Sequence, residues 1–281
     1  MTASFAFHQL DVFTAVPLLG NPLAVVHAAE VLDAVRMQAF ARWTNLSETT
    51  FLLPPTDPLA DYRVRIFTPV RELPFAGHPT LGSCHAWLAA GGRPKGEEIV
   101  QQCGVGRVRI RRDGERLAFA APPLIRSGAL EPEVLEQVVR SLRIERSAVR
   151  ASQWVDNGPG WVAVLLGSRA EVLALKPDFA AMRGLELGVV APWSKADGDE
   201  AVQFEVRAFV PTLGAAEDPV TGSLNAGLGQ WLIGAGLAPS HYVASQGTAL
   251  GRAGRVHVDR IGDDTWIGGH TVICVEGRVT L

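Results

Sequence analysis

The strongest constraint on the fold is an internal duplication, because two halves of the chain carry similar blocks in the same order. VRIFTP at 64–69 returns as VRAFVP at 206–211, and GRVRI at 106–110 returns as GRVHV at 254–258. A repeat of this length indicates a duplicated domain rather than a solenoid of short units. We therefore expect two domains of similar fold.

A further pair of blocks follows the first of these repeats. The first copy is ELPFAGHPTLGS at 72–83, and the second is EDPVTGS at 217–223. Aligned on their shared Gly-Ser, the copies set His-Pro opposite Asp-Pro. Proline is favoured as the first residue of a helix, and the residue before it then lies at the N-cap. Each copy is thus predicted to lead into a helix, which starts at Pro79 in the first half and at Pro219 in the second.

The two predicted helix starts are candidates for an anion site. A helix N-terminus offers backbone N–H groups and a partial positive charge, which suit a carboxylate or a developing oxyanion. Two such ends facing one cleft would bind an anion together. In this alignment His78 is equivalent to Asp218, and the asymmetry indicates different roles for the two residues.

The remainder of each half reads as strands around one apolar helix. Asp33 is a candidate N-cap for a helix to about Trp43, with Val35 and Ala39 at helical spacing. Strands are expected at 5–13, 23–27, 49–53, 62–67, 99–102, 106–111 and 116–120, and further helices at 79–90, 131–141 and 219–233. We expect a first domain over 1–122, a second over 123–270, and a strand-like tail, 271–281, as a candidate to return to the first domain.

Composition excludes several classes of function. The 281 residues carry 26 basic and 29 acidic side chains, so the net charge of −3 gives no electrostatic case for nucleic acid or an anionic membrane. There is no signal-peptide pattern, and no run approaches the ~20 apolar residues of a membrane span. The three cysteines are scattered and lack metal-ligand spacing. We expect a cytoplasmic protein without a metal site.

Glu48 is the first candidate for chemistry. It lies in NLSETTF at 45–51, between a predicted helix and a strand, and apolar residues surround it in the sequence. Most glutamates are solvated surface groups. Burial, however, raises the pKa of a carboxylate toward the range that is useful for acid–base catalysis.

Three further candidates come from the duplicated motif. His78 reads either as an N-cap, as a core histidine or as a catalytic group, and Asp218 is an equally good N-cap. Ser223 could simply bond to its own backbone within the first helical turn. The duplication favours a shared site, because it would bring His78 and Asp218 toward one cleft.

Taken in order, GNPLAVV at 20–26, NLSETTF, ELPFAGHPTLGS and EDPVTGS resemble the PhzF-like (phenazine biosynthesis) family over essentially the whole chain. The resemblance implies an α+β, diaminopimelate-epimerase-like fold, with two pseudo-twofold-related domains that are each a curved, mostly antiparallel sheet around a central helix. It also implies a homodimer that needs no cofactor and acts on a small-molecule carboxylate.

The resemblance also assigns roles to residues. The family's catalytic glutamate falls on Glu48, and its supporting His, Asp and Ser fall on His78, Asp218 and Ser223. Substrate-binding positions fall on Asn21, Ser47, Gly77 and Gly222. The related epimerases use two cysteines at the helix starts, and this chain has none there, so two-thiol racemisation is not expected.

The sequence therefore predicts a cofactor-independent isomerase, similar to the trans-2,3-dihydro-3-hydroxyanthranilate isomerase of the family. Glu48 would move a proton between carbons of a small carboxylate. Two alternatives stay open: an epimerase or lyase on a related amino or hydroxy acid, and a non-catalytic interaction protein that retains the fold.

Overall fold

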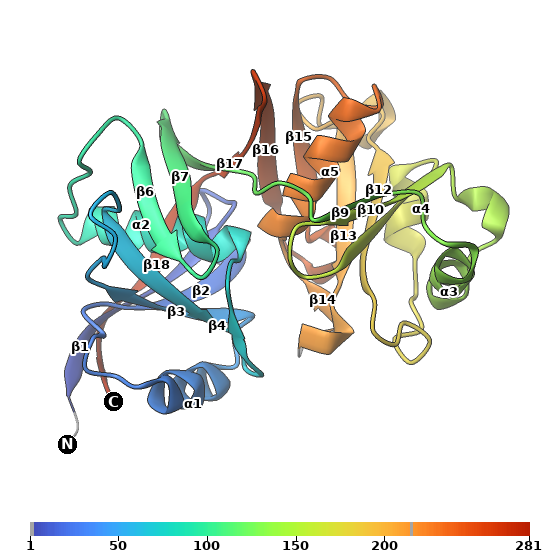
Figure 1. Cartoon of the computed structure of the whole chain (residues 1–281). Helices are drawn as coiled ribbons and strands as arrows, with labels where there is room; N and C mark the ends of the chain where they lie inside the picture. Colours follow the sequence, from blue (N-terminus) through green and yellow to red (C-terminus); the bar gives the residue numbers. More distant parts are fainter. Residues whose placement is uncertain (1–2, 214–215) are drawn as a thin grey trace. The chain divides into compact units, whose positions relative to one another are not determined.

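The computed structural model describes residues 3–213 and 216–281. It divides into two compact units, each with its own group of strands and a central helix (Figure 1). Unit 1 comprises Met1–Ala120 with Gly268–Leu281, and unit 2 comprises Ala121–Ile267. Both units mix strands and helices, which confirms the α+β class.

The sheet of unit 1 is mostly antiparallel. Its strands are β1 Ser4–Val12, β2 Asn21–Val26, β3 Glu48–Leu53, β4 Tyr62–Phe67, β5 Glu72–Leu73, β6 Ile99–Cys103, β7 Gly106–Asp113, β8 Arg116–Ala120 and β18 Thr271–Thr280. Strands β2 and β3 run parallel, as do β4 and β6, whereas the pairs β1–β18, β1–β2, β3–β4, β4–β5, β6–β7 and β7–β8 are antiparallel. Strand β18 pairs with β1 along its full length, so the tail forms an edge of this sheet.

The central helix of unit 1 is α2, Gly77–Ala89. It contacts β18, β1, β2 and β3 toward one edge of the sheet and β8 at the other, so the sheet curves around it (Figure 1). The helix is mostly buried and lacks charge in its first and last turns, as the sequence predicted. Gly82 permits this packing, because a Cβ there would lie 2.5 Å from the Leu23 side chain.

Unit 2 repeats this arrangement. Its strands are β9 Arg126–Gly128, β10 Ala151–Asp156, β11 Trp161–Leu165, β12 Glu186–Pro192, β13 Phe204–Phe209, β14 Glu217–Asp218, β15 His241–Gln246, β16 Gly254–Ile261 and β17 Asp264–Gly269, whose last two residues belong to unit 1. Its helices are α3 Pro132–Leu142, α4 Arg169–Ala174 and α5 Gly222–Gly234. The 3₁₀ turns are η1 Arg146–Ala148, η2 Lys195–Asp197, η3 Pro211–Leu213 and η4 Thr248–Leu250. Strands β11 and β12 are parallel, as are β13 and β15, which matches the parallel pairs of unit 1. Helix α5 packs on β10, β11 and β16.

Helix α2 begins earlier than predicted, and helix α5 begins later. Helix α2 begins at Gly77 with Ala76 as N-cap, so Pro79 is its third residue. Proline is tolerated there because the N–H groups of a first turn have no intrahelical acceptor. Helix α5 begins at Gly222 with Thr221 as N-cap, three residues after Pro219. The prediction that prolines start these helices is therefore wrong, and neither His78 nor Asp218 is an N-cap.

The outer helices follow their sequence signals more closely. Helix α1, Ala34–Thr44, is capped by Asp33, whose side chain accepts from the Arg36 N–H at 2.8 Å. Its buried residues are Met37, Phe40 and Ala41. Val35 and Trp43, which mark the predicted face, are 77% and 79% exposed. The helix was thus predicted correctly, but its buried face was not.

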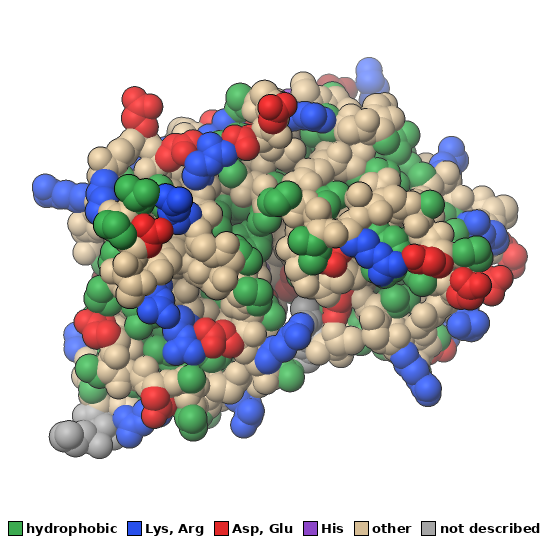
Figure 2. Space-filling view, viewed as in Figure 1, with side chains coloured by type: hydrophobic (Ala, Val, Ile, Leu, Met, Phe, Trp, Pro, Cys, Tyr) green, Lys and Arg blue, Asp and Glu red, His purple; other side chains and the backbone are tan. Residues whose placement is uncertain are grey.

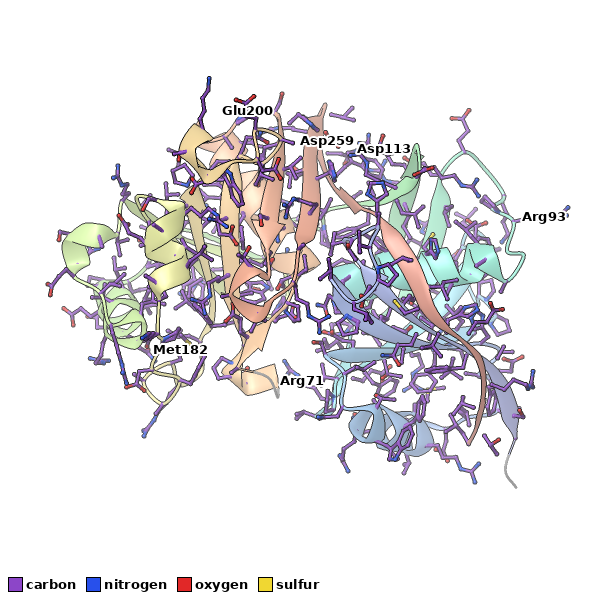
Figure 3. All side chains as sticks on the ribbon, turned by 180° about the vertical axis from the view of Figure 1, so that it is seen from behind. Arg71, Arg93, Asp113, Met182, Glu200 and Asp259 are labelled. Atoms are coloured by element: carbon purple, nitrogen blue, oxygen red, sulfur yellow. The ribbon has the colours of Figure 1, made fainter. Side chains whose placement is uncertain are left out.

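Charged side chains lie mainly on the surfaces of the two units. Basic and acidic side chains are interspersed on the face that Figure 2 shows. In unit 1, Arg93 points outward from its loop (Figure 3). Within the described ranges, the helices are too short or too polar to cross a membrane.

Candidate active site

Glu48 is positioned by the turn between α1 and β3. Asn45 ends α1 in a left-handed conformation with φ 53°, which Asn tolerates well, and the chain then enters β3 at Glu48. Two residues on, Thr50 accepts a hydrogen bond at 2.9 Å from Ser83 of α2. Because side chains alternate along a strand, Glu48 lies on the same face as Thr50, toward α2.

Glu48 meets His78 at the start of α2. The Glu48 Oε2 atom lies 3.3 Å from His78 Nε2, and the two residues are 9% and 3% exposed. On the other side of the ring, Asn21 Nδ2 lies 3.2 Å from His78 Nδ1. An amide NH₂ can only donate, so with Asn21 in this orientation Nδ1 accepts and Nε2 carries the proton. The ring N–H of His78, at Nε2, is therefore on the side that faces the Glu48 carboxylate.

The imidazole of His78 is held in its neutral form. Burial lowers the pKa of His78 from 6.5 to about 3. At neutral pH this side chain is a hydrogen-bond donor rather than a cation. The pair therefore consists of a buried carboxylate and a neutral donor beside it, which can hold and exchange a proton.

The other candidates in unit 1 lie around this pair. Ser47 is half-buried and directly precedes Glu48, and Asn21 begins β2. Gly77 is the first residue of α2, so its N–H has no acceptor within the helix, and the same holds for the N–H of His78. Pro79 has no N–H, which leaves this helix start with one donor fewer.

In unit 2, Asp218 stabilises the loop before α5. The Thr221 hydroxyl donates to Asp218 Oδ2 at 2.6 Å and accepts from Gln246 Nε2 at 2.9 Å. The Gln246 side-chain oxygen accepts from the Thr221 N–H at 3.0 Å and from Asn225 at 2.9 Å. This buried network fixes the backbone just before the helix, and Asp218 acts in it from strand β14.

Ser223 is the second residue of α5 and is held from two directions. Its hydroxyl oxygen accepts from the Trp161 indole at 3.1 Å, and its carbonyl accepts from Asn157 Nδ2 at 2.8 Å. The hydroxyl therefore keeps its proton for donation to another group. The N–H groups of Gly222, Ser223 and Leu224 lack acceptors within the helix. This helix start is a set of donors without an imidazole.

Two ion pairs show how the halves correspond. Arg65 donates twice to Glu72 from β4 to β5, and Arg207 donates twice to Glu217 from β13 to β14. In each case the glutamate lies opposite a phenylalanine of the neighbouring strand. The first glycine of the central helix then comes five residues after the glutamate in both units.

This correspondence changes the alignment of the duplicated motif. His78 is the second residue of α2 and Ser223 is the second residue of α5. Asp218 therefore corresponds to Leu73 rather than to His78. The alignment on Gly-Ser was wrong, because Gly82-Ser83 are the sixth and seventh residues of α2, whereas Gly222-Ser223 are the first and second residues of α5.

The same register identifies a residue that the sequence analysis missed. In unit 1, Leu23 of β2 lies opposite Glu48 in a parallel pair, and in unit 2, Trp161 of β11 lies opposite Glu186. Glu186 is thus the counterpart of Glu48, and it is 3% exposed. Its local sequence does not resemble NLSETTF, so only the strand register could have found it.

The described parts of the chain contain no group of three or more His, Cys, Asp or Glu residues that could hold a metal ion. Independence from metals stays a prediction, as does the shared cleft. The expectation that both helix starts serve one site also stays a prediction, and enzyme kinetics of variants in each unit test it.

The sequence from residue 10 to residue 277 matches the family model described as phenazine biosynthesis-like protein, PhzC-PhzF. The chain belongs to the PhzC-PhzF family. A trans-2,3-dihydro-3-hydroxyanthranilate isomerase from Pseudomonas chlororaphis is 35% identical over 218 residues, which cover 76% of this chain and 74% of that protein. Antisense-enhancing sequence 1 from Schizosaccharomyces pombe is 34% identical and covers 97% and 98% of the two chains.

Solved structures of PhzC-PhzF relatives agree with the fold. A PhzF-family phenazine biosynthesis protein from Enterococcus faecalis superimposes with a TM-score of 0.80 at 25% identity, over 99% of this chain and 100% of that one. These likenesses confirm the family resemblance and the fold class predicted from the sequence. This PhzC-PhzF chain is an isomerase-type enzyme.

Proposed function

We propose that the chain is a cofactor-independent isomerase in which Glu48 removes a proton from one carbon of a small carboxylate and returns it to another. The observation that carries the proposal is the buried pair of Glu48 and His78, with 3.3 Å between Oε2 and Nε2. A carboxylate away from bulk water is a stronger base than a solvated one, because its charge is less well stabilised.

His78 supports Glu48 in both halves of the transfer. As the carboxylate, Glu48 has its Oε2 3.3 Å from Nε2 of the neutral imidazole, and the attraction between this charge and the N–H dipole keeps the carboxylate oriented toward α2. When Glu48 holds the abstracted proton, the same imidazole stays neutral, so it neither adds nor removes charge. Asn21 maintains this arrangement through Nδ1 of the ring. During the transfer, the net charge of the Glu48–His78 pair therefore changes only by the one proton that Glu48 takes up and releases.

For unit 2 we propose a binding role. Ser223 and the N–H of Gly222 donate to oxygen atoms of the substrate, including oxygen on which negative charge develops. Asp218 positions these donors, since its carboxylate holds Thr221 directly before the helix. The relative from Pseudomonas chlororaphis makes trans-2,3-dihydro-3-hydroxyanthranilate the first compound to test as a substrate.

The decisive experiment follows solvent deuterium. The compound is incubated in D₂O with the wild-type chain and with Glu48→Gln, and products are analysed by NMR. The proposal requires a shifted double bond for the wild type and none with the variant, and the new C–H bond carries deuterium to the extent that the proton on Glu48 exchanges with solvent before it is returned. Deuterium at the original carbon with inversion and no shift would identify an epimerase instead. Turnover by Glu48→Gln near the wild-type rate would exclude Glu48 as the proton carrier.

A further inference from the structure

The last residue of β15, Gln246, uses its whole side-chain amide to hold the segment that leads into α5. Its Oε1 atom accepts from the Thr221 N–H at 3.0 Å and from Asn225 Nδ2 at 2.9 Å. Its Nε2 atom donates to the Thr221 hydroxyl at 2.9 Å and to the Asp218 carbonyl at 3.2 Å. A primary amide has two donors and two acceptor sites, so all four are used in a residue that is 1% exposed.

Through Thr221 the amide of Gln246 also orients the Asp218 carboxylate. A hydroxyl has one proton, and because Gln246 donates to the Thr221 oxygen, that proton is directed to Asp218 Oδ2 at 2.6 Å. The Thr221 carbonyl accepts from the N–H and from Nδ2 of Asn225. The N–H, the hydroxyl and the carbonyl of this N-cap residue are therefore all held, which fixes the direction of the N–H groups that follow it in α5.

The counterpart of Gln246 in unit 1 follows from strand pairing. Gln246 lies opposite Gly254, and Cys103 lies opposite Gly106. These two glycines begin the repeated GRV blocks of the two halves. Cys103 of β6 is therefore the residue that unit 1 has in place of Gln246. A thiol is a weak donor and a weak acceptor, so it cannot make the four hydrogen bonds of a primary amide.

The other two members of the network are also replaced in unit 1. Leu73 of β5 occupies the position of Asp218, and Ala76 is the N-cap in place of Thr221. Neither side chain can form a hydrogen bond, yet α2 begins on the same backbone plan. The scaffold therefore does not require the polar network. Burying polar groups is costly even when they are paired, so its presence in unit 2 calls for a role other than folding.

We propose that Gln246 is a positioning residue for the isomerase reaction. It holds Thr221, and through Thr221 it keeps the Asp218 carboxylate and the donors at the start of α5 in one fixed geometry. Donors that are fixed in advance stabilise developing negative charge without having to reorganise during the reaction. This assignment rests on the binding role proposed for unit 2. Gln246 itself acts only through its neighbours and does not contact the substrate.

The first test is Gln246→Glu, which keeps the length of the side chain. The ionised carboxylate only accepts hydrogen bonds, so the Thr221 hydroxyl and the Asp218 carbonyl lose their donor. At pH 8 we expect kcat/KM to be about 10–100-fold below wild type, because misplacing a binding group by ~1 Å can cost about 10²-fold. Burial and the nearby Asp218 carboxylate raise the pKa of the new acid. The deficit should therefore shrink by at least about 5-fold at pH 5.5, where the neutral acid has an O–H that donates again.

Two further variants separate positioning from stability. Gln246→Met has a similar size and cannot titrate, so its deficit in kcat/KM should be the same at both pH values. The matched control is Gln137→Glu on α3 of the same unit. Gln137 Nε2 donates to the carbonyls of Ala181 and Arg183 at 3.1 Å each, and neither bond involves the α5 segment. This control should lower the melting temperature but keep the wild-type kcat/KM at both pH values.

The kinetics are measured on the compound that the wild-type chain turns over, and every result is expressed relative to wild type at the same pH. Wild-type kcat/KM in Gln246→Glu or Gln246→Met at pH 8 would overturn the positioning role. So would a Gln246→Glu deficit that does not change with pH, or the same pH dependence in Gln137→Glu. Circular dichroism at both pH values checks folding, and if one Gln246 variant is unfolded, the other decides.

The positioning role and the proposed function fail in different ways. Turnover by Glu48→Gln would remove the proton carrier, whatever the profiles of the Gln246 variants. Unchanged profiles of the Gln246 variants would remove only the positioning role and leave the assignment of Glu48 intact. A wild-type chain that isomerises no carboxylate would remove both.

Discussion

The starts of α2 and α5 have the same backbone plan but different chemistry. In both, a glutamate opens the parallel neighbour strand, and a glycine opens the helix. The second helical residue is His78 in one and Ser223 in the other. A single position thus separates a helix start with an imidazole beside Glu48 from a helix start with a hydroxyl. Duplication has kept the scaffold, and the difference lies in side chains that the backbone does not require.

The largest expected effect compares the two buried glutamates. Glu48→Gln should lower kcat by about 10²–10⁴-fold, because Gln cannot accept and return a proton at neutral pH. Glu186→Gln should leave kcat within about 10-fold, because Glu48, and not its counterpart in β12, carries the proton in the proposed mechanism. Steady-state kinetics on the true substrate measure both. The comparison fails if the two variants lose the same amount of kcat.

Acid should destabilise the chain through His78 and not through its counterpart Ser223. Because burial lowers the folded pKa of His78 to about 3, the unfolded state binds more protons than the folded state between about pH 6.5 and pH 3. Stability present above pH 6.5 is therefore lost as the pH falls through this window. At pH 4.5 the loss from this group should be about 2–3 kcal/mol.

Urea unfolding at pH 7.5 and pH 4.5 measures this loss. His78→Asn should show a smaller acid loss than the wild type by that amount. His27, whose pKa burial lowers to about 4, acts in the same direction in both proteins. The difference between the proteins therefore isolates His78. An equal acid loss in both would show that His78 is protonated in the folded chain.

The next effect concerns the second helical residues themselves. His78→Asn should lower kcat by about 10–100-fold, less than Glu48→Gln, because a supporting donor is lost while the proton carrier stays. Ser223→Ala should raise KM by about 10-fold if its hydroxyl binds a charged substrate oxygen. The double variant His78→Asn/Ser223→Ala then shows whether the two units act on one substrate. If the fold-losses in kcat/KM of the single variants simply multiply, the two residues have independent roles.

The smallest effect compares the N-caps. Thr221→Val should cost about 1–3 kcal/mol in the free energy of unfolding, because it leaves the buried Asp218 carboxylate and Gln246 amide without their shared hydroxyl. The equivalent residue in unit 1 is Ala76, which makes no side-chain cap bond, so Ala76→Ser should change little. Equal losses would show that the cap position, and not the Asp218 network, determines the cost.

Sequence patterns predicted the elements better than their registers. The Asp33 cap, the strand at 62–67 and the helix at 131–141 depend on residues that lie close together in the chain, so the local sequence predicts them. The equivalence of His78 and Ser223 is not a local property. It follows from the two Arg–Glu ion pairs that fix β5 and β14 against their neighbours. Matching letters in the Gly-Ser pairs suggested a different equivalence, and only strand pairing excludes it.

The candidate site shows the same division. Glu48 and His78 were singled out from motifs, and the structure brings them together in unit 1. Their geometry with Asn21 required coordinates, because 57 positions separate Asn21 from His78 in the chain. Glu186 escaped detection, since a glutamate before an apolar strand is a common pattern. Trp161 and Gln246 escaped detection for a different reason: they form hydrogen bonds with residues far away in the sequence, Ser223 and Thr221.

The pairing of β1 with β18 has a consequence for how the chain is synthesised. Arg278 on β18 bonds to Ser4 on β1 across 274 positions, whereas unit 2 is one continuous stretch. On the ribosome, unit 2 can therefore complete its sheet while β1 still lacks a neighbour on one edge. Closing so long a loop is slow, and until β18 emerges the exposed edge can pair with other chains. A stop codon before residue 271 would thus damage the half of the protein that was made first.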